Sequence, residues 1–157
     1  MKRIAVFSDT HHQFTRLPAA IGKMGKVDRI FHLGDYGADA ERISGAAGGV
    51  PFVAVRGNND YFTDLPRVLV ERVEDASILL VHGDAFYTLG SLFHAAEQRG
   101  CGVVLFGHTH EPLMQASGKI LALNPGSLSL PRRGYPAAFA VLEVSGGDIG
   151  AKIIPLE

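Results

Sequence analysis

Cysteine is nearly absent from this sequence, which has one thiol, Cys101, in 157 residues. A single cysteine excludes an internal disulfide framework and is compatible with a reducing cytoplasm, where we expect the protein to act. Cys101 stands where an apolar run begins, so we predict a buried, inert thiol rather than a nucleophile.

The chain also lacks an excess of either charge, because 15 basic and 16 acidic residues leave a formal charge of −1. A nucleic-acid-binding domain normally carries a basic excess or stripe. The pair Arg132–Arg133 is too short for one, and we favour a solvated loop pair over a contact with a substrate phosphate. No apolar stretch approaches the roughly 20 residues that span a bilayer, and Ile4–Phe7 is too short for a signal peptide. We expect a small-molecule partner and no membrane contact; a homo-oligomer stays open.

Short apolar runs alternate with helical patterns along the first two-thirds of the chain. Continuous apolar runs of this length are typical of strands buried on both faces of a sheet. The predicted strands are Ile4–Ser8, Arg29–Leu33, Phe52–Arg56, Ser77–Val81 and Val103–Phe106, with Arg67–Val73 as an additional candidate. Helical spacing groups Leu17, Ile21 and Met24, then Ala40, Ile43 and Ala47 after a possible N-cap at Asp39, then Leu89, Leu92, Phe93 and Ala96 before Gly100.

The last third reads as strands without helices, at Leu113–Ser117, Ile120–Asn124, Ala137–Val144 and Ile149–Ile154. Hydrophobic residues make up 46% of the sequence, which suits a globular chain with a substantial core. We therefore predict one α/β domain over residues 1–157, with two sheets packed face to face and helices outside.

Each of the five predicted α/β strands ends in a polar side chain that can bind a metal. The segments are Asp9-Thr10-His11, Gly34-Asp35, Gly57-Asn58-Asn59-Asp60, His82-Gly83-Asp84 and Gly107-His108-Thr109-His110. In open α/β sheets, ligands bind beyond the carboxyl ends of the strands. If the strands are mostly parallel, these side chains converge at one edge. Gly34, Gly57 and Gly107 each precede a proposed ligand, where a sharp turn and a positive φ are expected, although ordinary strand-end turns explain a single glycine as well.

Two carboxylates, one amide and four imidazoles form a mixed oxygen and nitrogen set that favours Mn²⁺, Fe or Zn²⁺. Seven ligands are too many for one four-coordinate ion but suit two ions that share a carboxylate, for which Asp35 is the candidate. Such a pair can supply a hydroxide at neutral pH and hold both oxygens of an in-line displacement at phosphorus. Because two divalent ions outweigh two carboxylates and a hydroxide, the centre would attract phosphate.

In this order, the five segments resemble the blocks of the calcineurin-like metallophosphoesterase superfamily. Asn124-Pro125-Gly126-Ser127 adds a resemblance to its small YfcE-type phosphodiesterase branch. The resemblance implies a four-layer αββα sandwich and phosphodiester substrates. It also implies two divalent ions, usually Mn²⁺, with Ni²⁺, Zn²⁺ and Fe²⁺ as alternatives. One ion would be bound by Asp9, His11, Asp35 and His110, and the other by Asp35, Asn58, His82 and His108.

Two positions depart from the pattern of the larger superfamily members. Asn59 replaces a histidine that helps the leaving group; it can hydrogen-bond a phosphoryl oxygen but cannot supply a proton, which favours good leaving groups. His12 stands where glycine is common and either touches the phosphate or faces solvent. Asp35, Asn59 and His12 are thus the candidate catalytic residues.

The remaining polar residues near these segments are expected to be structural. His32 falls inside a strand and His94 inside a helix, so neither is proposed as a ligand. Asp60 and Asp84 are expected to orient the ligand loops or the histidines.

An enzyme is not the only function compatible with this resemblance. One eukaryotic branch of the superfamily keeps the fold but serves in retromer coat assembly, with an altered metal site. All four expected imidazoles are present here, which favours a phosphoesterase over a scaffold. A metallohydrolase acting on another bond is disfavoured by the number and order of the segments.

Overall fold

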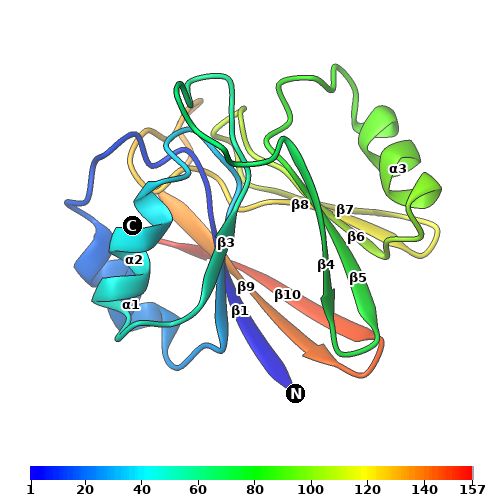
Figure 1. Cartoon of the computed structure of the whole chain (residues 1–157), viewed down its shortest axis with the longest axis horizontal. Helices are drawn as coiled ribbons and strands as arrows, with labels where there is room; N and C mark the ends of the chain where they lie inside the picture. Colours follow the sequence, from blue (N-terminus) through cyan, green and yellow to red (C-terminus); the bar gives the residue numbers. More distant parts are fainter. Residues whose placement is uncertain (157) are drawn as a thin grey trace.

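The computed structural model describes residues 1–156, and its strands form two five-stranded sheets (Figure 1). The first sheet has the order β10 (Asp148–Pro155), β9 (Ala138–Ser145), β1 (Lys2–Phe7), β2 (Arg29–His32) and β3 (Phe52–Ala54). The second has the order β4 (Val68–Val73), β5 (Ala76–Val81), β6 (Val103–Leu105), β8 (Ile120–Asn124) and β7 (Leu113–Ser117).

Parallel pairing is confined to the strands that carry the predicted site. In the first sheet, β1 pairs in parallel with β2, and β2 with β3. In the second sheet, β5, β6 and β8 run parallel. The remaining pairs are antiparallel. The carboxyl ends of the parallel strands therefore reach the same edge within each sheet.

Helices cover the outer face of each sheet, which gives the predicted four-layer αββα arrangement (Figure 1). Helices α1 (Leu17–Met24) and α2 (Asp39–Ala46) lie on the first sheet, and α3 (Leu89–Gln98) lies on the second. The central core joins the two sheets through side chains such as Val6, Phe31 and Leu80. Because central strands such as β1, β5 and β6 are buried on both faces, their continuous apolar runs are explained.

The ends of the helices agree only in part with the sequence. Thr88 caps α3 by accepting a hydrogen bond from Ser91 N, and Gly100 follows its C-cap with φ 65°. Asp39, however, is not the N-cap of α2: it is the first residue of the helix, after Ala38. Its carboxylate instead accepts hydrogen bonds from Thr10 Oγ1 (2.6 Å) and His12 N (2.9 Å). The prediction was wrong because a distant loop competes for this carboxylate.

The additional strand candidate is confirmed as β4, which pairs with β5. Cys101 is buried at the start of β6, and burial raises the pKa of its thiol, as expected for an inert cysteine. Among residues 1–156, no helix has the length and hydropathy needed to cross a membrane.

Candidate metal centre

The loops that follow β1, β2, β3, β5 and β6 gather at one end of the two sheets, at the top of Figure 1. Four of the predicted ligands form a tight group there: one ligand atom each from Asp9, His11, Asp35 and His110 lies within 4.8 Å of the others. His110 Nε2 lies 3.3 Å from Asp9 Oδ1, and His11 Nε2 lies 3.6 Å from Asp35 Oδ2. We call this group, with His82 and His108, the cluster.

His82 and His108 complete the cluster from the second sheet. His82 is buried, with Nε2 3.3 Å from Asp35 Oδ1 and 3.8 Å from Asp9 Oδ1. The ring of His108 lies 5.2 Å from that of His82, and its backbone N–H donates to Asp9 Oδ2 (3.0 Å). Six of the seven predicted ligands therefore meet where the two sheets adjoin.

Asn58 differs from these six, because its side chain is exposed in the turn between Gly57 and Asn59. The turn itself is held close to the cluster: the backbone N–H of Asn59 donates to Asp35 Oδ1 (3.0 Å). The structure thus brings the Asn58 backbone near the cluster without fixing its amide there.

Carbonyl groups behind two of the imidazoles set the direction in which each ring points. His82 Nδ1 lies 2.8 Å from Leu33 O, and His110 Nδ1 lies 2.6 Å from Leu130 O. Because a carbonyl only accepts hydrogen bonds, both Nδ1 atoms carry a proton, and in the neutral form of each ring the lone pair is on Nε2. Both lone pairs then face the carboxylates of the cluster, which is the orientation that a metal ligand needs.

Within residues 1–156, five buried side-chain atoms have no hydrogen-bond partner, and four of them belong to the cluster. These four are Asp9 Oδ1, His11 Nε2, His82 Nε2 and His108 Nδ1. A buried polar atom without a partner costs about 1–3 kcal/mol, so folded proteins rarely keep several together. Oxygen and imidazole nitrogen atoms without protons or partners fit divalent cations, and the donor set therefore passes this test.

The two carboxyl groups of the cluster have pKa values below the usual value for aspartate. Burial alone raises the pKa of Asp9, but the close contact with His110 (3.3 Å) and the charges of His82 and His110 in their protonated forms outweigh burial, so this pKa lies below the usual value. The same balance, with His82 and Asn59 as partners, also lowers the pKa of Asp35. Both groups are therefore carboxylates at neutral pH, as cation ligands must be.

The imidazoles divide into two kinds. Burial lowers the pKa of His82 and His110, but the adjacent carboxylates outweigh it and raise both values. At His11, burial outweighs the charges of Asp35 and Asp9, so the pKa of this imidazole is lowered. A cation that binds here displaces protons from His82 and His110, since metal and proton compete for the same lone pair.

Backbone strain is concentrated in the cluster residues rather than in the glycines before them. Positive φ angles occur at Asp9 (55°), Asp35 (54°), His108 (70°) and His110 (61°). Each costs on the order of 1–3 kcal/mol and persists where surrounding contacts fix the chain. Positive φ angles at non-glycine residues are over-represented in functional sites.

The glycine prediction holds at one of three positions. Gly34 has φ 99°, but Gly57 and Gly107 do not have positive φ. They are needed for space: a Cβ on Gly57 would lie 2.7 Å from Asp35 N, and one on Gly107 would lie 2.7 Å from Asp9 Oδ2. At these two glycines, the requirement is close approach of the backbone to a carboxylate residue.

The two candidate catalytic residues beside Asp35 lie on the same side of the cluster. Asn59 Nδ2 donates to Asp35 Oδ2 (2.8 Å). The His12 ring packs on Tyr36, with ring centroids 4.1 Å apart, and its Nδ1 contacts Asp39. The His12 side chain is 60% exposed and lines a surface pocket together with Asn59.

Several residues judged structural or peripheral have defined contacts. His32 is buried between Thr10 and Gly34, and His94 lies exposed on α3, so neither joins the cluster. Arg133 pairs with Glu111 (2.9 Å) on the surface. Asp60 accepts hydrogen bonds from Tyr36 N (2.7 Å), Gly37 N (3.0 Å) and Gly57 N (2.6 Å), and so orients two ligand loops as predicted. Asp84 lies 3.7 Å from Arg67.

Asn124, at the end of β8, and the segment after it form hydrogen bonds to the ligand loops, which residue patterns alone did not predict. Asn124 Nδ2 donates to Gly107 O (3.1 Å) and Thr109 Oγ1 (3.0 Å). Ser127 Oγ donates to Asp9 O (2.8 Å), and Ser129 Oγ donates to Thr10 O (2.8 Å). By itself Asn124-Pro125-Gly126-Ser127 reads as a turn, and only the family resemblance gave a signal that it lies near the site.

Comparison with known proteins agrees with this geometry. The calcineurin-like phosphoesterase superfamily domain matches residues 1–147. A probable metallophosphoesterase of Methanocaldococcus jannaschii is 36% identical over 161 residues, covering 98% of this chain and 81% of the relative. The phosphodiesterase YfcE of Escherichia coli is 34% identical over 110 residues, covering 66% of this chain and 58% of YfcE.

Among solved structures, Vps29 of Entamoeba histolytica in complex with zinc superposes with a TM-score of 0.77. The alignment covers 99% of each chain at 18% identity, and so shows a shared fold alone. The family match spans the five loop segments and every strand of the two sheets except β10. This chain therefore belongs to the calcineurin-like phosphoesterase superfamily.

Proposed function

We propose that this chain is a phosphodiesterase that uses two divalent metal ions, most readily Mn²⁺, with Ni²⁺, Zn²⁺ and Fe²⁺ as alternatives. Family membership implies a hydrolase of phosphoric esters that needs divalent metal. The observation that carries the proposal is the group of four buried ligand atoms without partners, contributed by loops of both sheets. Divalent cations would satisfy carboxylate oxygens and imidazole lone pairs together at neutral pH.

The proposed ligands of one ion are Asp9, His11, Asp35 and His110, and those of the other are Asp35, Asn58, His82 and His108. The spacing within the first group supports the first set. Asp35 is assigned to both sets because its two oxygens face different histidines, with Oδ2 toward His11 (3.6 Å) and Oδ1 toward His82 (3.3 Å). For Asn58, the support is its place in the turn that contacts Asp35.

Bound divalent ions would supply positive charge for a phosphoryl group and acidify a water for attack on phosphorus. The protein's part is to hold that arrangement rigid. Carbonyls behind His82 and His110 fix the rings, and Asn59 fixes the Asp35 carboxylate. Because an amide has two N–H groups and Asp35 takes one, the other N–H of Asn59 is free for a phosphoryl oxygen.

A diester is favoured over a monoester by the relationship to YfcE, which is described as a phosphodiesterase. Because Asn59 cannot protonate a leaving group, esters with good leaving groups should react fastest in either class. The Nε2 of His12 would contact the substrate phosphate from the open side of the site.

The test is to strip the protein of metal and resupply Mn²⁺, Ni²⁺, Zn²⁺ or Mg²⁺ with matched chromogenic diester and monoester substrates. We expect diester turnover that appears with Mn²⁺, is lost with chelator, and is abolished in Asp35→Ala and Asn58→Ala. Asp148→Ala, an exposed carboxylate at the start of β10, is the matched control and should keep full activity. Full activity in Asp35→Ala would refute the two-metal site.

The second candidate function is a scaffold for protein assembly. The observation that supports it is the similarity in fold to Vps29. This second function predicts a protein that folds and even binds metal but does not hydrolyse phosphoesters with any of the four metals. The complete set of four imidazoles in the cluster favours the hydrolase.

A further inference from the structure

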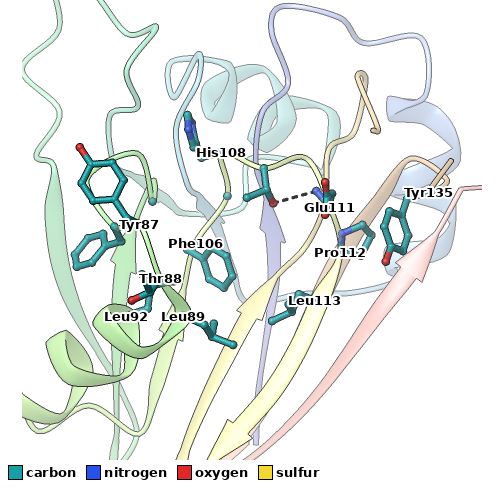
Figure 2. A pocket seen from close by; sticks show the side chains of 14 residues that line it. Tyr87, Thr88, Leu89, Leu92, Phe106, His108, Glu111, Pro112, Leu113 and Tyr135 are labelled. Atoms are coloured by element: carbon teal, nitrogen blue, oxygen red, sulfur yellow. Dashed lines mark hydrogen bonds between the residues drawn. The ribbon is translucent and has the colours of Figure 1, made fainter. Parts of the chain in front are cut away.

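A pocket of about 240 Å³ opens beside the cluster, between α3 and the end of the second sheet. His108 lies at its upper end, while Leu89, Phe106 and Leu113 lie deeper, as Figure 2 shows. Tyr87 and Tyr135 stand on opposite sides of the opening. Side chains from β7 and α3, together with the loop after β6 and the other loops around them, thus build a largely aromatic and aliphatic wall.

Three polar side chains in this wall, Thr88, Thr109 and Glu111, already have partners, whereas His108 Nδ1, at the end of the pocket beside the cluster, has none. Thr88 Oγ1 accepts from Ser91 N (3.1 Å) as the cap of α3. Thr109 Oγ1 accepts from Asn124 Nδ2 (3.0 Å) and from Glu111 N (3.2 Å), the second bond being the dashed line in Figure 2. The carboxylate of Glu111 pairs with Arg133 (2.9 Å). The pocket therefore offers no free charge to an occupant, and an uncharged group suits it best.

His108 connects the pocket to the cluster. One face of its residue lines the pocket, while its ring lies 5.2 Å from the ring of His82 and its backbone N–H donates to Asp9. Gly83 and Gly107, on either side of this connection, have no side chains to obstruct it. A substituent on a phosphorus atom held at the cluster would reach the pocket directly.

We propose that this pocket binds one ester substituent of the substrate, an uncharged aromatic or heteroaromatic ring, while the phosphoryl group lies at the cluster. The inference rests on the proposed function and narrows its substrate class to aryl or nucleoside-like phosphoesters. Drug-sized ligands occupy pockets of roughly 300–1,000 Å³, so this smaller volume fits one ring system. Aromatic side chains on facing walls favour a flat ring through offset or edge-on stacking.

The experiment compares phenylphosphonate with methylphosphonate, neither of which is hydrolysed, on the Mn²⁺-loaded protein by titration calorimetry. We expect the wild type to bind phenylphosphonate on the order of tenfold more tightly, because the ring is removed from water. Leu113→Trp fills the pocket and should remove this preference. Met114→Trp, the next residue on β7 with an exposed side chain, is the matched control and should retain it.

A second variant guards against misfolding of Leu113→Trp. The Tyr87 side chain is 95% exposed, so Tyr87→Ala removes an aromatic wall without disturbing the core and should reduce the phenyl preference. Tyr61→Ala removes another exposed tyrosine, on the opposite side of the site near Asn59, and should leave the preference unchanged.

The outcomes separate this inference from the proposed function. A phenyl preference lost in Leu113→Trp and reduced in Tyr87→Ala supports the pocket even if no ester is hydrolysed, in which case the phosphodiesterase proposal alone fails. The inference is overturned if neither phosphonate binds, if the wild type shows no preference, or if the preference survives both pocket variants. Loss of the phenyl preference in Tyr61→Ala, with the preference kept in both pocket variants, would show that the ring binds on the other side of the site, next to Tyr61.

Discussion

Asn59 holds both oxygens of Asp35: its side-chain amide donates to Oδ2 at 2.8 Å and its backbone N–H donates to Oδ1 at 3.0 Å. This double contact helps to lower the pKa of Asp35 and fixes the plane of a carboxylate that faces His11 and His82. Asn59 thus acts on the metal centre through Asp35, besides any contact it makes with substrate.

Asn59→Ala should therefore weaken Mn²⁺ binding as well as turnover. The side-chain bond is lost while the backbone bond remains, so we expect an affinity reduced on the order of tenfold, at the lower end of such orienting partners. Calorimetric titration with Mn²⁺ and a diester assay at saturating metal separate the two effects. An unchanged affinity together with an unchanged rate would remove Asn59 from the mechanism.

Gly57→Ala should damage the site through space alone, since Gly57 does not have a positive φ. The new Cβ would lie 2.7 Å from Asp35 N and 2.9 Å from His82 Cδ2, and the backbone atom cannot move without shifting the ligand loop. We expect destabilisation by about 1–3 kcal/mol and Mn²⁺ affinity reduced by at least roughly tenfold.

Gly102→Ala is the control for this prediction, because nothing lies within 4 Å of a Cβ at Gly102. It should change the free energy of unfolding by less than about 0.5 kcal/mol. Urea denaturation in chelator and Mn²⁺ titration give the two readouts. If Gly57→Ala changed the free energy of unfolding and the Mn²⁺ affinity as little as Gly102→Ala, the close approach of Gly57 to Asp35 would not constrain the site.

The strands, and the edge of the sheets at which the site lies, were predictable because a single physical cause determines each of them. Burial on both faces makes strands such as β1 and β5 continuously apolar, and parallel pairing sends their carboxyl ends to one edge. Ligand-type residues directly after those strands therefore had to lie near one another. The four layers followed from the same apolar runs, since two sheets and their helices must bury them.

What sequence patterns missed depends on contacts between distant segments. Asp39 looks like a helix cap by position, but Thr10 and His12 approach it from another loop. Positive φ angles occur at Asp9 and His110, whose backbones are fixed by the surrounding contacts, but not at Gly57 and Gly107, where they were expected. No local pattern encodes such competition between partners, so these features emerge only in the folded chain.

Asn124→Ala should weaken both stability and metal binding, although Asn124 is no ligand. Its buried amide donates to Gly107 O (3.1 Å) and Thr109 Oγ1 (3.0 Å), in the loop that carries His108 and His110. Gly107 O keeps the hydrogen bond from Thr109 N (2.8 Å), but two buried hydrogen bonds of the amide are lost, so we expect about 1–3 kcal/mol of destabilisation.

Urea denaturation and Mn²⁺ titration of Asn124→Ala give the two values. Gln115→Ala, an exposed amide on β7, is the matched control and should change the free energy of unfolding by less than about 0.5 kcal/mol. If Asn124→Ala kept wild-type Mn²⁺ affinity despite lower stability, the loop would not depend on this amide for its ligand geometry.

His32 should make the metal-free protein sensitive to mild acid. Burial lowers the pKa of His32 to about 4, from an ordinary 6.5, and Gly34 N–H donates to its Nδ1 (3.1 Å), where a proton would otherwise bind. Between these values the unfolded chain takes up a proton that the folded chain refuses. The free energy of unfolding therefore falls as pH drops from 6.5 to 4, by on the order of 3 kcal/mol in total.

Urea denaturation of wild type and His32→Gln at several pH values between 7 and 4, in chelator, tests this assignment. The variant has no imidazole to protonate, so its stability should fall less steeply with acid, by about one proton in the slope of stability against pH. The raised pKa values of His82 and His110 act with the opposite sign, but they are common to both proteins and cancel in the comparison. Equal slopes in the two proteins would show that His32 does not stay neutral in the folded state.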